Sequence, residues 1–468
     1  MADGLPVERL RQYLRELKPE ARSLLIAELE RGLLRGEATP GAELVLQELR
    51  RLAREAGRPA SRGGSLSRLF FQPLEPFLVD DIATHKHPGR IARVALEPIW
   101  EWICRDLLPG EAKAVTDDVA RAIGQHDNVR AEDLARAFQD RVALRGEAAL
   151  DAAHADEKSL RRLANEIATP RGVEDFRTVV DVLKARDALE DFGAVLPGHT
   201  AALSDDILGM LKTRLDAVPS GEPGKFLQRL LIVMSRLAAP WMLAKVATRG
   251  AGSNSAPGLS ESRYGVAVSI ILAEIDRQVG ELKAELRSGR GLAVGALLKS
   301  IHDAVRGMRA EIDLSADSVW ARQLAAACAD TSNLLKGEIE AMPGRVARLL
   351  SPRAVQDIAP GSSIDRGDAA DTEAQIAFVN ICRQYADGLA IGDVTRRAWA
   401  ELEGHLRTVG EPLAAALREA GDSDRTFRQS QFEAAVRFSA IVFGDDHANM
   451  LAQTGNDPGE RRMAARAS

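Results

Sequence analysis

The chain has few cysteines, and their spacing limits the kinds of site they can form. It carries three cysteines in 468 residues, Cys104, Cys328 and Cys382, an odd number at distant positions, and no CxxC pair occurs. A disulfide framework or a thiolate zinc site needs several sulfur atoms at matched positions, so neither is expected. Each cysteine lies among apolar residues, which predicts buried free thiols.

The chain also lacks a long apolar run. No stretch approaches the roughly 18 apolar residues needed to span a bilayer, and the first residues form no charged-then-apolar leader. The most apolar stretch, 225–248, is interrupted by charges and bent by a proline: Arg229, Arg236, Lys245 and Pro240. We therefore expect a cytoplasmic protein.

Neither sign of charge dominates. Lys and Arg number 62 against 68 Asp and Glu, which gives a formal net charge of −6. The arginines are scattered among glutamates, whereas a protein that binds nucleic acid normally carries a basic stripe. A hydrophobic content of 45% with 28% charged residues is ordinary for a folded globular chain. We expect no nucleic-acid partner and no wholesale disorder.

Recognisable catalytic and cofactor motifs are missing as well. HExxH and GxSxG do not occur. The stretch "PSGEPGKF" contains Gly224 and Lys225, but Pro219 stands where a phosphate-binding loop needs its first glycine and Phe226 where it needs a hydroxyl. The sequence thus identifies no catalytic residue and no cofactor, and it favours a protein that is not an enzyme.

Helical periodicity is present almost everywhere, and clear β-alternation is hard to find. A length of 468 residues favours about three domain-sized units. These features predict an all-α, multi-unit helical bundle protein. We predict an N-terminal helical unit, a central helical domain, a Gly- and Ser-rich linker, a C-terminal helical bundle and a disordered tail: 1–57, 68–248, 249–261, 262–455 and 456–468.

Residues 268–312 carry the most regular pattern in the chain. Apolar residues recur there at alternating intervals of four and three, on both sides of a glycine-containing turn: Val268, Leu272, Ile275, Val279, Leu282 and Leu286, then Val294, Leu298, Ile301, Val305, Met308 and Ile312. This spacing predicts a long antiparallel helical hairpin with a coiled-coil seam as the principal element of the C-terminal half. Two helices of a larger bundle would show the same spacing.

The stretch 70–110 gathers aromatic residues and a histidine pair. If a helix continues to residue 85, Asp81 and His85 lie on one face, and His87 could turn toward the same point. These three ligands are of suitable type and could hold zinc or a similar ion with an open coordination position. The alternative, which the lack of a recognised spacing favours, is a polar turn beside a packed aromatic core. In that core, Trp100 and Trp102 should face different directions.

A second cluster of polar residues lies between helical segments at 422–433. Asp422 and Glu433 occupy the first and last positions of a possible calcium loop. Phe427, however, stands where the sharp turn of such a loop demands glycine. A helix start capped by Ser423 or Asp424 is the favoured interpretation.

These observations favour a helical scaffold, adaptor or regulatory protein that acts through protein–protein contacts, with a protein partner or with itself. One alternative is a metal-dependent enzyme with its site at Asp81, His85 and His87. Another is a peripheral membrane protein whose 225–248 helix places Leu, Ile, Met and Trp in lipid and its basic residues at the head groups.

Overall fold

The structure of the chain is a computed structural model. It describes residues 66–80, 88–169, 171–288, 292–315, 317–386 and 388–455, together with a few isolated positions before residue 66: Tyr13, Leu14, Leu17, Arg22, Leu25, Val45 and Leu49. Apart from those positions, the predicted N-terminal unit lies outside the described residues. The predicted tail at 456–468 also lies outside them.

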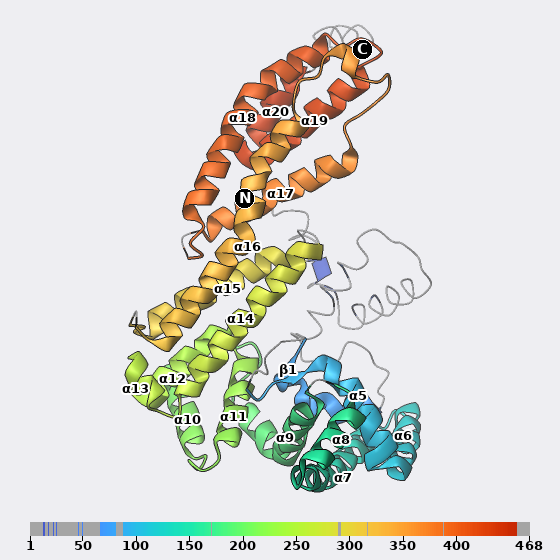
Figure 1. Cartoon of the computed structure of the whole chain (residues 1–468), viewed down its shortest axis with the longest axis vertical. Coiled ribbons are helices and arrows are strands. Elements are labelled where there is room, and N and C mark those ends of the chain that lie inside the picture. Colours follow the sequence, from blue (N-terminus) through green and yellow to red (C-terminus); the bar gives the residue numbers. More distant parts are fainter. Residues whose placement is uncertain are drawn as a thin grey trace. The chain divides into compact units, whose positions relative to one another are not determined.

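The chain divides into two compact helical units, residues 1–273 and 274–468 (Figure 1). Within the described ranges, the one sheet consists of two parallel strands of two residues each, β1 (Leu78–Val79) and β2 (Ile91–Ala92). The prediction of an all-α, multi-unit fold is confirmed.

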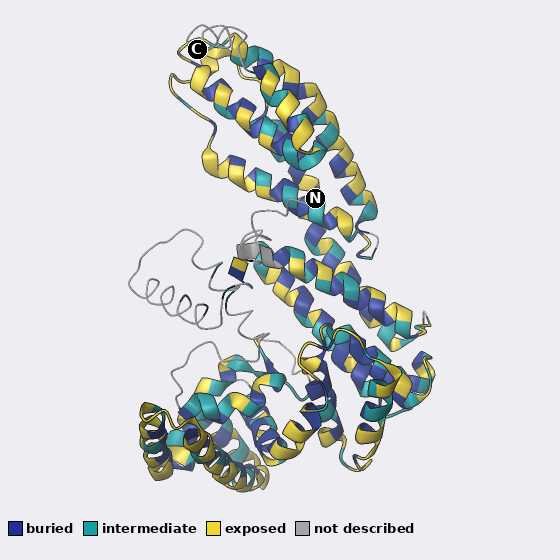
Figure 2. Ribbon diagram, turned by 180° about the vertical axis from the view of Figure 1, so that it is seen from behind, coloured by how far each residue is buried: buried dark blue, intermediate teal, exposed yellow. Residues whose placement is uncertain are grey.

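The first unit packs its helices around a core of aliphatic and aromatic side chains, and the buried positions are dark blue on the ribbon in Figure 2. Helix α7 packs against α4, α6 and α9, while α9 and η1 both pack against α11. The elements in order are α4 (Leu66–Phe71), η1 (Gln72–Phe77), η2 (Arg93–Ala95), α5 (Leu96–Trp102), η3 (Ile103–Leu107), α6 (Pro109–Gly124), α7 (Asn128–His154), α8 (Glu157–Ile167), α9 (Gly172–Gly193), α10 (Asp205–Asp216), α11 (Pro223–Arg236), η4 (Pro240–Met242), α12 (Leu243–Ala251) and α13 (Ala256–Ser260).

Several helices begin at a polar side chain that satisfies a free backbone N–H. In each case the capping oxygen accepts from the amide three residues further along: Asp127, Asp156, Ser204, Ser318 and Asp365. Replacing such a cap with alanine typically costs about 1 kcal/mol, so these residues fix where the helices start.

The aromatic stretch forms part of the core of the first unit. The ring of Phe70 lies 5.3 Å from that of Trp100 and 5.8 Å from that of Phe138, measured between centroids. Trp102 is buried and meets Phe176 edge-on at 5.0 Å, whereas Trp100 is only half-buried. The prediction that the two tryptophans face different directions is confirmed.

The predicted hairpin corresponds to α14 (Gly265–Ser288) and α15 (Leu292–Glu311). Of its twelve seam positions, eleven are buried with 8% exposure or less, and the other, Leu286, is half-buried. The boundary between the two units falls inside α14. The part of α14 that belongs to the second unit runs beside α15, as Figures 1 and 2 show from opposite sides.

The second unit also contains a bundle of longer helices. Helix α16 packs against α17 and α18, and α18 packs against α19 and α20. The elements are α16 (Val319–Leu349), η5 (Val355–Asp357), α17 (Arg366–Gln384), α18 (Gly392–Arg418), α19 (Arg425–Phe443) and α20 (Asp445–Gly455). Fully buried Leu335, Ile339, Ile376 and Phe438 contribute to its core.

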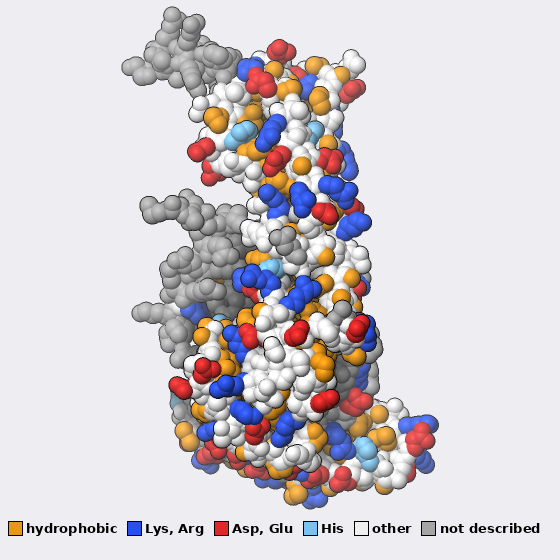
Figure 3. All heavy atoms as spheres, turned by 90° about the vertical axis from the view of Figure 1, so that its left-hand side faces the viewer, with side chains coloured by type: hydrophobic (Ala, Val, Ile, Leu, Met, Phe, Trp, Pro, Cys, Tyr) orange, Lys and Arg blue, Asp and Glu red, His pale blue; other side chains and the backbone are white. Residues whose placement is uncertain are grey.

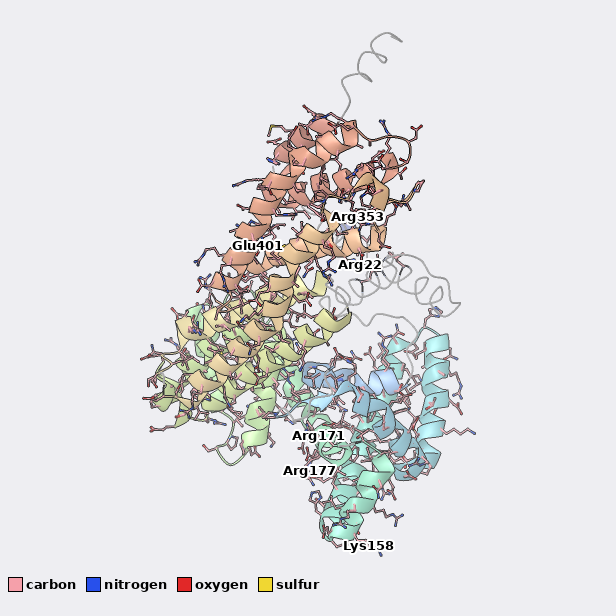
Figure 4. All side chains as sticks on the ribbon, turned by 45° about the horizontal axis from the view of Figure 1, so that its top comes forward. Arg22, Lys158, Arg171, Arg177, Arg353 and Glu401 are labelled. Carbon is pink, nitrogen blue, oxygen red and sulfur yellow. The ribbon has the colours of Figure 1, made fainter. Side chains whose placement is uncertain are left out.

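Side chains from α19 fix the C-terminal end of α16. Gln431 Nε2 donates to the carbonyl oxygens of Leu349 and Ser351, both at 2.9 Å. Arg428 Nη2 donates to the carbonyl oxygen of Arg353, labelled in Figure 4, at 2.6 Å. The carbonyl group of Leu349, the last residue of α16, has no partner within the helix, so the first of these bonds caps α16, while the other two hold the segment that follows it.

The polar cluster at 422–433 is the start of a helix. Helix α19 begins at Arg425, so most of the possible calcium loop is helical. The Asp424 carboxylate is buried, pairs with Arg428 at 3.3 Å and accepts the Gly421 N–H at 3.0 Å. The helix start is confirmed with Asp424 at the N-cap position, but its side chain makes no capping hydrogen bond to the helix.

The apolar stretch 225–248 is divided between α11, η4 and α12. Its apolar side chains are buried in the first unit, among them Leu230, Leu231, Val233, Leu243 and Val246. None of the helices in the described ranges is long and apolar enough to cross a bilayer. Insertion of this stretch into lipid would therefore require these side chains to leave the core.

The predicted linker, 249–261, contains the end of α12 and the short helix α13. Gly252 adopts a left-handed conformation with φ of +67°, which ends α12 and suits glycine. Leu259 is fully buried, and Gly250 packs against the ring of Tyr264. The domain ranges drawn from the sequence stay a prediction.

Positive and negative side chains are mixed on the surface. On the face of the molecule in Figure 3, Lys and Arg alternate with Asp and Glu and do not gather into a patch of one sign. This distribution agrees with the near balance of 62 basic and 68 acidic residues in the chain.

Candidate functional site

The metal ligands predicted from the sequence, Asp81, His85 and His87, lie outside the described residues. The residue before them, Asp80, accepts a hydrogen bond from Arg93 at 2.6 Å. No group of three or more His, Cys, Asp or Glu side chains within the described ranges is placed to hold a metal ion. The metal site therefore stays a prediction.

The cysteines are free, as expected, and their surroundings make them poor nucleophiles. Cys328 and Cys382 are buried as predicted, whereas Cys104 is only half-buried. Burial raises the pKa of all three thiols, and for Cys382 it raises the pKa to about 12. Thiolate is the reactive form, so these thiols stay mostly protonated near neutral pH, and the two buried ones are also shielded from reagents.

A cavity of about 260 Å³ opens in the first unit between five structural elements: α4, η1, α7, α9 and α11. One wall is apolar and is built from Leu69, Pro73, Pro76, Val182, Leu189 and Ile232. The prolines are exposed to the cavity because Leu74 and Phe77 anchor the opposite side of η1 in the core.

Gly193 allows α9 and α11 to approach each other beside this wall. A Cβ atom at Gly193 would lie 3.2 Å from Cγ2 of Ile232 and 3.6 Å from Nη2 of Arg236. The first of these distances is tighter than ordinary van der Waals contact. Ile232 and the Arg236 guanidinium therefore both lie close to Gly193, and an apolar and a cationic group are neighbours at this point of the lining.

A buried arginine holds the polar side of the cavity together. Arg186 is only 6% exposed, and its Nη1 donates to Gln139 Oε1 at 2.7 Å. Gln139 Nε2 in turn donates to the carbonyl oxygens of Leu69 and Phe70, at 3.1 and 2.9 Å. This network joins α9 to α7 and α7 to α4. A polar network whose members are satisfied stiffens the structure around it, so the lining is largely preformed.

Two further contacts neutralise the charge of Arg186. Its guanidinium pairs with Asp140 at 3.1 Å and with Asp187 at 3.0 Å. Both carboxylates are mostly exposed, so the positive charge is balanced at the edge of the protein and not in its interior. The hydrogen bond from Arg186 lowers the pKa of Asp187 below its ordinary value.

A second arginine in the lining is also paired. Arg136 bridges α7 and α9 through ion pairs with Asp187 at 3.0 Å and Glu190 at 2.5 Å. Its hydrogen bond to Glu190 raises the pKa of Arg136. The positive charge of Arg136 is therefore already balanced by carboxylates within the first unit.

Two other charged residues in the lining have no such partners. Arg236, in the last turn of α11, and Glu132, in the second turn of α7, are both exposed. Neither side chain makes a hydrogen bond or ion pair with any residue that the structure describes. An unpaired guanidinium beside an apolar wall can bind a carboxylate through two parallel hydrogen bonds, while the wall takes an apolar group.

Sequence reasoning did not find this site. Its lining comes from four separate segments, 69–76, 132–139, 182–193 and 232–236, and only the packing of the first unit brings them together. One signal was present in the sequence. Arg186 continues the helical stripe of Val179, Leu183 and Leu189, and a charged residue within an apolar stripe indicates a buried polar network.

Comparisons of the chain with models of known protein families, with curated proteins and with solved structures found no match.

Proposed function

We propose that the protein is a helical adaptor or scaffold that works in the cytoplasm through protein–protein contacts. The cavity in the first unit is its recognition site, and it receives a side chain of a partner protein. The observation that carries this proposal is the pairing of a preformed apolar wall with the unpaired charges of Arg236 and Glu132.

The size of the cavity supports a side-chain anchor over a whole small molecule. Pockets for small molecules usually enclose about 300–1,000 Å³. The cavity here encloses about 260 Å³. Protein interfaces, by contrast, concentrate their energy in a few side chains that fill small desolvated pockets.

The rigidity of the lining supports the same function. Burying one Leu, Ile or Phe side chain contributes roughly 1.5–3 kcal/mol. Ordering a flexible binding surface would offset part of that gain, at about 0.5–1.5 kcal/mol for each side chain immobilised. Arg186 and Gln139 are already fixed in the free protein by the hydrogen bonds described above, so this cost arises only at exposed side chains of the lining such as Arg236.

Photo-crosslinking tests the proposal. A benzoylphenylalanine at Gln72, an exposed residue in the cavity lining, should give a discrete adduct with one protein in the cell that makes this chain. The same substitution at Gln125, an exposed glutamine on the cap of α6, should not. The captured protein is then purified, and its Kd for the whole chain is measured.

Gln72→Trp and Gln125→Trp form the matched pair for that measurement. Tryptophan at position 72 fills part of the cavity, so binding should weaken by about tenfold or more, the effect expected from losing one buried anchor. Tryptophan at position 125 should leave the Kd unchanged. Equal Kd values for both variants, or no protein adduct at position 72, would contradict the proposal.

A further inference from the structure

Three arginines line the cavity, and only one of them has its charge available. Arg186 is balanced by Asp140 and Asp187, and Arg136 by Asp187 and Glu190. The Arg236 guanidinium has no partner among the residues that the structure describes. Arg236 is therefore the arginine of the lining whose charge no described residue already balances.

We infer that the partner segment carries a single side-chain carboxylate, Asp or Glu, next to its apolar anchor, and that Arg236 binds this carboxylate. This inference rests on the proposed function. Complementary charge at an interface mainly sets which partner binds, and it adds to the affinity that the apolar anchor provides.

The spacing of anchor and carboxylate follows from the position of Gly193. A Cβ atom at Gly193 would lie 3.2 Å from Ile232 of the apolar wall and 3.6 Å from the Arg236 guanidinium, so these two groups are neighbours in the lining. An apolar side chain against Ile232 thus places its near neighbours in the peptide within reach of Arg236. The carboxylate belongs to a residue within about one helical turn of the anchor, because residues three and four apart share a helix face.

Glu132 limits the partner to one acid at this point. Its carboxylate lines the same cavity and has no cation of its own among the described residues. A second acidic residue in the partner segment would lie near Glu132 with no arginine to balance its charge, because Arg136 and Arg186 are already paired with carboxylates. Like charges brought together at an interface oppose binding, so an acidic tract is disfavoured.

A random peptide library displayed on phage tests this chemistry with the purified full chain as bait. The wild type should enrich peptides that have one Asp or Glu within four residues of a large apolar residue. Arg236→Glu should instead enrich peptides with Lys or Arg at that place. The matched control is Arg145→Glu, because Arg145 is an exposed arginine on α7 with no partner among the described residues, outside the cavity lining. It should select the same peptides as the wild type.

Synthetic peptides from that selection allow a thermodynamic cycle. Changing the peptide acid to its amide, or Arg236 to Gln, should each weaken binding by about tenfold, a typical loss for a charged hydrogen-bonded pair. Combining the two changes should cost little more than either alone, because they remove the same contact.

The outcomes separate the two proposals. One outcome would overturn the role of Arg236 but leave the peptide-binding cavity intact. In that outcome the selected peptides bind the wild type and do not bind Gln72→Trp, but Arg236→Glu still selects peptides with an acidic residue. Additive effects in the cycle would overturn it in the same way. If no enriched peptide depends on the cavity, the proposed function itself fails, and the inference fails with it.

Discussion

Replacing Arg186 with methionine should lower the free energy of unfolding of the first unit. The size of the loss depends on how exposed the partners of Arg186 are: Gln139, Asp140 and Asp187. Methionine keeps most of the length of the side chain and removes the guanidinium. Breaking a fully buried ion pair costs about 3–5 kcal/mol because a charge is left without a partner. Asp140 and Asp187 are mostly exposed, however, and water will solvate them once Arg186 is gone.

The remaining loss comes from Gln139. Its side chain is 2% exposed, and its Oε1 would lose the donor that lies 2.7 Å away. A buried acceptor left without a partner costs about 1–3 kcal/mol. We therefore expect Arg186→Met to lower the free energy of unfolding by about 1–3 kcal/mol, below the range for a broken buried ion pair.

Urea unfolding followed by tryptophan fluorescence measures this change, because three of the five tryptophans, Trp100, Trp102 and Trp241, lie in the first unit. Gln139→Leu is the second arm of a double-mutant cycle. Because leucine needs no hydrogen bond, the double variant should lose less stability than the sum of the two single losses. Strictly additive losses, or a loss above 4 kcal/mol for Arg186→Met alone, would refute the reasoning.

Four other predictions concern both units. Ile301→Asp places an unpaired charge at a fully buried seam position of α15 and should lower the free energy of unfolding by several kcal/mol. Circular dichroism should then show the second unit melting at a lower temperature. Arg306→Asp changes an exposed residue of the same helix and should melt like the wild type. Because burial raises the pKa of Cys382 to about 12, its thiol should not react with a disulfide reagent at pH 8 until urea unfolds the protein, and half-buried Cys104 should react first. The pKa of Asp187 is lower in the folded state than in the unfolded one. The stabilisation from ionised Asp187 is therefore complete above its unfolded pKa and is lost as the pH falls through its folded pKa. Arg186→Met should make the free energy of unfolding less sensitive to pH below about 4, measured in the same urea assay. The purified protein should carry no stoichiometric metal, and elemental analysis that finds about one zinc per chain, lost in a His85→Ala, His87→Ala variant, would instead favour the metal-site alternative.

The sequence was most informative where each residue reports on its own local surroundings. In the hairpin, the spacing of apolar residues is set by the geometry of one helix, and the buried positions from Val268 to Ile312 follow from it. The aromatic stretch behaved similarly, because Trp100 and Trp102 on one short helix must point apart. Such patterns need no knowledge of what the helix packs against.

The cavity could not be predicted in this way, because its residues are ordinary in their own segments. Arg136 and Glu190 look like charges on solvated helix faces, and their pairing depends on how α7 meets α9. The availability of Arg236 is harder still to predict. It depends on the absence of an acid within reach in three dimensions, whereas the sequence shows only neighbours along the chain.

The three hydrogen bonds that α19 makes to the end of α16 and the segment after it, the α16 clamp, also have a consequence for how the protein is made. The three carbonyl groups of Leu349, Ser351 and Arg353 bond to side chains that lie 82, 80 and 75 residues further along the chain. At translation rates of about 5–20 residues per second, roughly 4–16 seconds pass between synthesis of the end of α16 and synthesis of its clamp. Many small domains fold in less time than that. The nascent second unit must therefore wait on the ribosome with this helix end open, and a chain released before residue 428 would lack all three bonds.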